Sequence, residues 1–165
     1  MPLIRLGTIA AIDPGFDGAV AFLDEHGRLF GLQDTPTFTV TGGAKKKRTM
    51  DLRGMIDILR DYVPVKVAIE DVHSMPGQGV AGAFAFGRGF GAWEGILAAL
   101  SIPVVKVSPQ RWKKAMLDGM GKEKDASRVR ASELFPTAEL GLKKHHGRAD
   151  ALLIALWLWR QERGK

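Results

Sequence analysis

The sequence contains no cysteine and no long apolar run, and each absence excludes a class of protein. Without cysteine there are no disulfides, thiolate zinc sites or thiol nucleophiles, so any bound metal must use oxygen or imidazole ligands. The apolar stretch ALLIALWLW near the C-terminus is far too short to span a bilayer, so we expect no membrane association. Arg5 interrupts the apolar N-terminal stretch and no small-residue cleavage site follows it, so we expect no signal peptide and a cytoplasmic location.

The composition is that of an ordinary globular protein with an excess of positive charge. Of the 165 residues, 45% are apolar and 25% are charged, which predicts one folded domain over residues 1–165. Lysine and arginine number 24 against 18 acidic residues, a formal net charge of +6. This excess favours partners that carry phosphate, with nucleic acid first among them.

Apolar runs predict a sheet interleaved with helices. The run over residues 4–13 ends at Pro14-Gly15, which indicates a buried first strand that ends at Asp13. Two short apolar runs then flank a turn at residues 24–27 and predict an antiparallel hairpin, giving three antiparallel strands in all. The further predicted elements are strands over 65–71 and 103–109 and helices over 50–63, 109–117, 124–135 and 148–160.

Two other segments have unusual composition. Residues 39–49, TVTGGAKKKRT, carry four consecutive cations and little apolar character, so we expect a mobile, solvated loop. Between the two later strands, small residues recur four apart and would lie on one face of a helix. We expect that face to pack either against the sheet or against a second copy of the chain. The small residues are Ala83, Gly87, Gly91 and Gly95.

Three acidic residues each end or begin an apolar element. Asp13 follows the first strand, Glu70 ends the strand over 65–71, and Asp150 lies near the start of the last helix. If the two strands are neighbours, their ends lie about 5 Å apart, and a helix start can meet them there. Clustered carboxylates repel one another unless divalent cations neutralise them, and oxygen ligands suit Mg²⁺ or Mn²⁺. Taken singly, each acid is equally explained as a turn, strand-end or first-turn residue.

In four ordered blocks, the chain resembles the RuvC-type Holliday junction resolvases, especially the short phage-type members. The blocks are AIDPGFDGAVAFLD, VAIEDVHSMPGQGV, VVKVSPQRWKKAML with DGMGKEKDASRVRASELFP, and HHGRADALLIALWLW. The resemblance implies an α/β, RNase H-like fold, with a mixed five-stranded sheet of three antiparallel and then parallel strands, flanked by helices. It implies a homodimer from a bacterial or phage-infected cell that cuts four-way DNA junctions with two Mg²⁺ or Mn²⁺ ions per active site, held by Asp13, Glu70 and Asp150.

The chain departs from that family at its fourth metal ligand. The relatives place an acid, or sometimes histidine, three residues before the last acid, and Gly147 stands there in this sequence. His146 precedes Asp150 by four residues and would share its helical face, so we expect His146 to bind the second metal or to donate a proton to the leaving oxygen. His145 competes for this role, and both histidines are equally explained as part of a basic loop that contacts DNA.

Basic and aromatic residues supply candidate DNA contacts in three segments. The cations of QRWKKAM and GKEKDASR would grip phosphates near the cleavage centre, and the cluster over 45–48 would reach a more distant arm of the junction. The family places an aromatic wedge after the strand-ending Glu, where this chain offers only histidine or methionine. The candidate DNA-binding residues are Lys45, Lys46, Lys47, Arg48, His73, Met75, Arg111, Lys113, Lys114, Lys122 and Lys124.

Three other functions compete with junction resolution. An RNase H-like nuclease of broader branched-DNA or RNA specificity would use the same acids. A junction-binding protein without catalytic activity would use the same fold. A sugar-kinase-like or actin-like ATPase also begins with Asp and Gly after a strand, but it needs two such domains, and 165 residues are too few.

Overall fold

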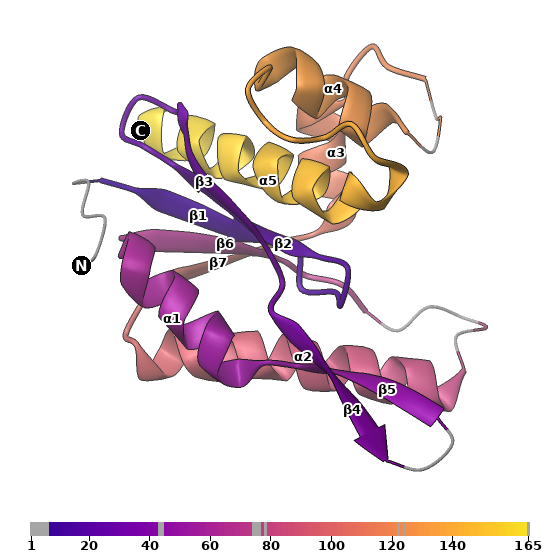
Figure 1. Ribbon diagram of the computed structural model, residues 1–165. Coiled ribbons are helices and arrows are strands. Elements are labelled where there is room, and N and C mark those ends of the chain that lie inside the picture. The colour runs from indigo at the N-terminus through magenta and orange to yellow at the C-terminus, as the bar shows by residue number, and fades with distance from the viewer. Residues whose placement is uncertain are drawn as a thin grey trace.

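A mixed five-stranded sheet forms the centre of the computed structural model, which describes residues 7–42, 45–73, 77, 79–121, 123 and 125–164 (Figure 1). The strand order is β3-β2-β1-β6-β7. β1 pairs antiparallel with β2 and parallel with β6, so the sheet changes from antiparallel to parallel at its centre. The strands are β1 (Ile9–Ile12), β2 (Ala19–Leu23), β3 (Leu29–Asp34), β6 (Lys66–Glu70) and β7 (Val104–Val107).

The central strands are apolar along their whole length because helices cover both faces of the sheet. Every residue of β1 and β2 is buried, as are the last four residues of β6. The predicted RNase H-like arrangement of three antiparallel and then parallel strands is confirmed. β1 begins at Ile9, after Gly7, whose positive φ places it in a turn. Residues 4–6 of the predicted first strand lie outside the described part of the chain.

Helices lie on both faces of the sheet (Figure 1). α5 packs on one face with α3 and α4, and α1 and α2 lie on the other. The predicted helices are confirmed, and α5 begins two residues earlier and ends three residues later than predicted. None of the helices within the described residues is long and apolar enough to cross a membrane. The helices are α1 (Leu52–Tyr62), α2 (Val80–Ala99), α3 (Pro109–Met116), α4 (Ala126–Leu134), the short 3₁₀ turn η1 (Lys143–His145) and α5 (His146–Arg163).

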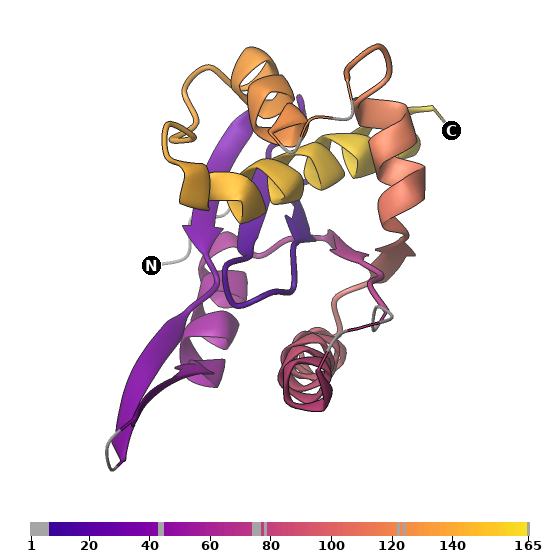
Figure 2. The same cartoon turned by 90° about the vertical axis from the view of Figure 1, so that its right-hand side faces the viewer.

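The basic segment over 39–49 is a β-ribbon and not the loop that its composition predicts. β4 (Thr37–Gly42) and β5 (Lys45–Met50) pair antiparallel and form a sheet of their own. The ribbon extends away from the main sheet (Figure 2). Threonine alternates with phenylalanine and valine along β4, and β-branched and aromatic residues suit a strand even when one face is exposed. The lysines contribute no apolar periodicity, which is why the pattern fails to reveal the strand.

The small-residue face of α2 does not pack against the sheet. A Cβ added at Gly87, Gly91 or Gly95 would meet no atom of the described residues within 4 Å. On the same helix, Val80 and Phe84 are 88% and 68% exposed. Of the two packing partners expected for this face, the sheet is therefore excluded, and a second copy remains the expectation.

Candidate active site

Asp13 and Glu70 lie side by side at the carboxyl ends of β1 and β6. These strands are parallel neighbours, and Ile12 pairs in register with Ile69, so the residues that follow them occupy adjacent positions. Neighbouring strands lie about 5 Å apart. Ala11 and Ala68, two positions before Asp13 and Glu70, belong to the core beneath α5. Because side chains alternate along a strand, both carboxylates face α5.

The third acid, Asp150, comes from the first turns of α5, which begins at His146. α5 packs against β1, β2 and β6. The helix approaches closely because Gly147 has no side chain, and a Cβ there would lie 2.1 Å from the carbonyl oxygen of Asp17. Gly147 thus lets the start of α5 rest on the loop between β1 and β2, and this places Asp150 over the ends of the strands.

Other side chains hold the three acids in place. The indole Nε1 of Trp112 donates a hydrogen bond of 2.8 Å to Oε1 of Glu70, and both residues are buried. Asp13 accepts a bond of 3.2 Å from the backbone N–H of Gly15, the glycine of the Pro-Gly turn. Trp112 lies on α3, whose start is fixed by the Ser108 side chain as an N-cap. α3 is therefore fixed in position relative to Glu70.

The acids are close enough to change one another's ionisation. Burial, followed by the negative charges of Asp150 and Glu70, raises the pKa of Asp13 to about 7, although Asp13 is only half-buried. Burial also raises the pKa of Glu70 and of Asp150, and a hydrogen bond from Ser127 partly offsets this effect at Asp150. The Lys113 ammonium lowers the pKa of all three carboxyls, so this cation faces the acids. Perturbed carboxyls gathered at one place are typical of a functional site.

These residues fit a divalent cation by charge and ligand chemistry. The described residues contain no set of three Asp, Glu or His side chains already arranged to hold an ion. Oδ1 of Asp150 is, however, buried without a hydrogen-bond partner in the described part of the chain, a costly state for a carboxylate oxygen. A cation there would bind this oxygen and offset the repulsion from Asp150 and Glu70, which adds to burial in raising the pKa of Asp13. Carboxylates are the ligands that Mg²⁺ and Mn²⁺ prefer.

The two histidines before Asp150 occupy different environments. His145 is buried, its Nδ1 accepts a bond of 3.3 Å from the backbone N–H of Leu142, and burial lowers its pKa. His146 is half-buried, and its electrostatic influence reaches the Asp150 carboxyl. Of the two, His146 is the one that the structure brings near an acid of the site. The sequence alone could not distinguish them.

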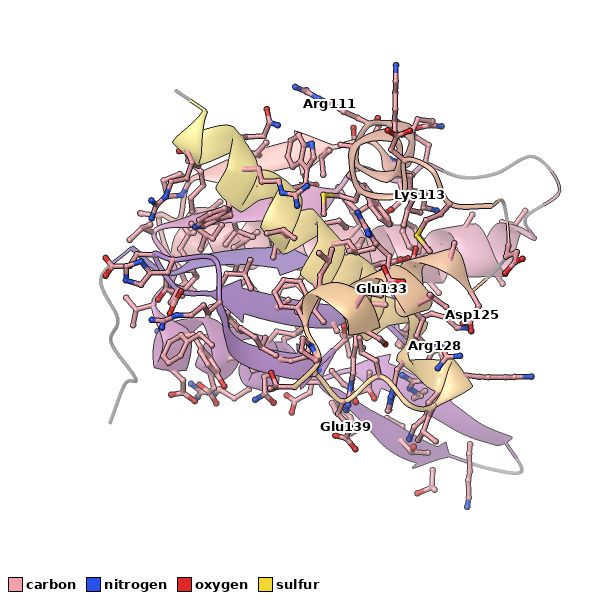
Figure 3. The ribbon with its side chains drawn as sticks, turned by 90° about the horizontal axis from the view of Figure 1, so that it is seen from above. Arg111, Lys113, Asp125, Arg128, Glu133 and Glu139 are labelled. Carbon is pink, nitrogen blue, oxygen red and sulfur yellow. The ribbon has the colours of Figure 1, made fainter. Side chains whose placement is uncertain are left out.

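Among the predicted DNA-binding residues, only some lie near the acids. Lys113 faces them, whereas Arg111 lies over the Trp157 ring and Lys114 is exposed; Arg111 and Lys113 are labelled on α3 in Figure 3. The side chain of His73 is 82% exposed and lies 3.9 Å from Asp71.

The other predicted DNA contacts lie either on the ribbon or outside the described residues. Lys46, Lys47 and Arg48 lie on β5, on the exposed ribbon. For Lys45 the structure describes only the backbone. Met75, Lys122 and Lys124 lie outside the described residues.

Sequence reasoning missed the residues that support the acids. In the sequence, Trp112 is an aromatic residue among the cations of QRWKKAM, and its buried indole N–H beside Glu70 depends on packing between distant elements. Ser127 reaches Asp150 from α4. Near it, Arg128 donates to Asp125 with a 2.7 Å bond from Nε and fixes the start of the same helix (Figure 3). The Arg128–Asp125 pair has the i, i+3 spacing of a helix. No spacing in the sequence signals the contact of Trp112 with Glu70 or of Ser127 with Asp150.

Comparison with known proteins gives relatives over most of the chain. The crossover junction endodeoxyribonuclease RuvC of Nitratidesulfovibrio vulgaris strain Hildenborough is 32% identical over 120 residues, which cover 72% of this chain and 71% of the relative. The RuvC of strain DP4 is 30% identical over the same shares. The chloroplastic Holliday junction resolvase MOC1 of Chlamydomonas reinhardtii is 41% identical over 85 residues, and the chain spans only 10% of that protein. No family model matches the sequence.

Solved structures support the fold. The structure of T. thermophilus RuvC in complex with a Holliday junction substrate superposes with a TM-score of 0.62 at 18% identity, covering 95% of this chain and 96% of that one. Another Thermus thermophilus RuvC structure gives a TM-score of 0.60 at 19% identity, with the same coverage. At 18% and 19% sequence identity, the similarity to these two structures establishes the fold of this chain alone.

Proposed function

The chain belongs to the RuvC family of crossover junction endodeoxyribonucleases, and from this premise we propose that it resolves four-way DNA junctions by paired hydrolysis of phosphodiester bonds. The observation that carries the proposal is the meeting of Asp13, Glu70 and Asp150 at one end of the sheet. Their raised pKa values, and the Oδ1 of Asp150, which has no hydrogen-bond partner among the described residues, favour a divalent cation at that place. The net charge of +6 favours a phosphate-bearing substrate.

The chain's own residues provide the chemical environment for this reaction. Asp13, Glu70 and Asp150 would hold the metal, which supplies an activated water and offsets charge on the phosphate when bound. Trp112 holds the Glu70 carboxylate in one orientation through its indole N–H. Lys113 faces the same carboxylates and brings a positive charge to the place where a phosphate would approach.

We also propose that two Mg²⁺ or Mn²⁺ ions bind in each site and that His146 is the fourth ligand or the proton donor. Gly147 has no side chain to offer, and the Asp17 carbonyl occupies the space where a Cβ would lie. His146 lies one helical turn before Asp150 and influences its pKa. Because imidazole is a better ligand for Mn²⁺ than for Mg²⁺, Mn²⁺ should support cleavage at least as well.

The His146 role is tested by cleavage rates of H146A in both metals. H26A serves as the control, because His26 is exposed in the β2–β3 turn beside Glu25. We expect H146A to cut junctions much more slowly than wild type or H26A, with the larger loss in Mn²⁺ if His146 is a ligand. Wild-type rates for H146A in both metals would contradict the role.

The active form is proposed to be a homodimer, because paired symmetric nicks need two active sites. The exposed small-residue face of α2 is the candidate contact. It offers Gly87, Gly91 and Gly95 with open space above each, so another backbone can approach closely. Val80 and Phe84 on the same helix would lose their exposure to water on such contact.

Substrate choice separates the proposed function from its alternatives. Purified protein with Mg²⁺ or Mn²⁺ is incubated with a four-way junction, a flap and a linear duplex, and the nicks are mapped. We expect paired, ligatable nicks in the four-way junction at the highest rate. Equal rates on flaps and junctions would favour a broader branched-DNA nuclease. Tight junction binding without any cleavage would favour a non-catalytic junction-binding protein.

A further inference from the structure

Arg48 joins the basic ribbon to the loop that carries Asp13. Its guanidinium Nη1 lies 2.7 Å from Oδ1 of Asp17, and Nη2 donates to the carbonyl oxygen of Phe16. Nε donates to Thr37 Oγ1 on the opposite strand of the ribbon at 3.2 Å. The same guanidinium lies 5.7 Å from the centroid of the Phe16 ring. One side chain thus binds both the ribbon and the β1–β2 loop.

The loop that Arg48 binds is tightly connected to the first acid of the site. Gly15 N–H donates to the Asp13 carboxylate at 3.2 Å, and Gly18 N–H donates to the Gly15 carbonyl at 3.0 Å. On its other side the loop touches α5, because the Asp17 carbonyl fills the space above Gly147. A displacement of Asp17 therefore reaches the Asp13 carboxylate through the Gly15 bond.

The three cations of the ribbon with described side chains differ in their surroundings. Lys46 and Lys47 are exposed and form no ion pair with any described residue. Arg48 is held by Asp17, whose side chain is 83% exposed. Among the described residues, the turn bonds of this loop come from backbone groups and the Asp13 carboxylate, and none uses the side chain of Asp17. A cation needed only for DNA phosphate would gain nothing from an acidic partner.

We propose that Arg48 and Asp17 are positioning residues for junction cleavage. Their ion pair holds the ribbon at a fixed angle to the Asp13 loop. DNA bound on the ribbon is thereby positioned with the phosphate to be cut next to Asp13, Glu70 and Asp150. Such positioning changes the rate of the chemical step because small misplacements of reacting atoms are costly. The inference rests on the proposed function.

The two residues should contribute little to stability, since exposed ion pairs are weak. The planar guanidinium, by contrast, makes several directed bonds that a lysine ammonium cannot reproduce. R48K therefore keeps the charge and loses the geometry. D17N keeps the shape of residue 17, loses the anion, and makes the protein one charge more positive.

The test compares D17N and R48K with wild type on a four-way junction, measuring kcat, KM and the melting temperature. D57N is the matched control, because Asp57 is an exposed acid on α1, on the far side of the sheet from the acids. K47A measures what the loss of one ribbon charge does to KM. We expect D17N to lower kcat about two- to fivefold, the range that loss of an exposed ion pair allows, and R48K to lower it at least as much, with KM and melting temperature near those of wild type, and D57N to leave kcat unchanged.

Other results would overturn the inference. If Arg48 acted only as a phosphate contact, D17N would free it, so KM would fall or stay constant while kcat stayed at the wild-type value. If D17N and R48K lowered the melting temperature together with kcat, the contact would be structural. Wild-type protein that fails to cut the junction contradicts the proposed function itself, which distinguishes that failure from the failure of the Arg48 role.

Discussion

The raised pKa of Asp13 gives the metal-free protein a defined dependence of stability on pH. Burial, with the charges of Asp150 and Glu70, raises this pKa from 3.8 to about 7, so the folded chain keeps a proton that the unfolded chain releases. The free energy of unfolding is therefore highest below about pH 4 and falls as the pH rises through about 7, as far as Asp13 contributes. The raised pKa values of Glu70 and Asp150 act in the same direction.

Melting temperatures in the presence of a chelator should show this effect. We expect the wild-type melting temperature to fall between pH 5 and pH 8, D13N to show a shallower fall, and Mn²⁺ to restore stability most strongly at pH 8. A melting temperature that rises over this range in the chelated protein, or a D13N slope equal to that of wild type, would contradict the assignment of the raised pKa.

Gly147 should tolerate no side chain. An added Cβ would lie 2.1 Å from the Asp17 carbonyl oxygen, so either α5 or the β1–β2 loop must move. We expect G147A to lower the free energy of unfolding by about 1–3 kcal/mol and to slow junction cleavage, as measured by chemical denaturation and nicking rates. G141A is the control for stability, because a Cβ at Gly141 meets no atom within 4 Å in the part of the chain that the structure describes. Equal stability of the two variants would disprove the close contact.

At the scale of elements, buried strands were predictable and the exposed ribbon was not. β1 and β6 are buried on both faces, so their apolar runs and the acids that end them stand out in the sequence. The approach of α5 to those strand ends depends on Gly147, whose role becomes visible only when the Asp17 carbonyl lies above it. The ribbon buries little apolar surface, so neither its strands nor its Arg48 contact leaves a pattern in the sequence.

The ribbon should contribute to the salt dependence of junction binding. Lys46 and Lys47 are exposed on β5 and available to neutralise phosphates. Each phosphate contact adds about 0.9 to the steepness with which log affinity falls against log salt. The slope for the K46A/K47A variant should therefore be shallower than that of wild type by about two. The measurement is the affinity for an uncleavable junction at several salt concentrations. Both proteins compared also carry D13N, so that neither cuts the DNA. An unchanged slope would mean that the ribbon does not touch DNA.

At the scale of the whole molecule, a dimer through α2 is testable without disturbing the protomer. A Cβ at Gly91 meets no atom of the described residues within 4 Å, so we expect G91E to fold normally. If two copies meet at this face, buried carboxylates would oppose one another and G91E should be monomeric by light scattering, with single uncoordinated nicks in place of paired ones. G141E places the same residue in open space elsewhere and should leave the oligomeric state unchanged. A dimeric G91E would exclude this face.

The charge of the whole molecule also bears on its function. The net charge of +6 coexists with an acidic centre that repels phosphate until cations neutralise it. Junction binding and junction cleavage are therefore expected to separate: basic residues govern the first, and Asp13, Glu70 and Asp150 with their metal govern the second.

The most direct test of the account is a comparison of wild type and D13N on one labelled four-way junction, with binding and nicking measured on the same samples with and without Mn²⁺. We predict that wild type binds the junction and cuts it into paired, ligatable nicks only when the metal is present. D13N should bind the junction at least as tightly, because it lacks one negative charge, and should not cut it. Cleavage by D13N at the wild-type rate, or cleavage by wild type in a chelator, would contradict the account.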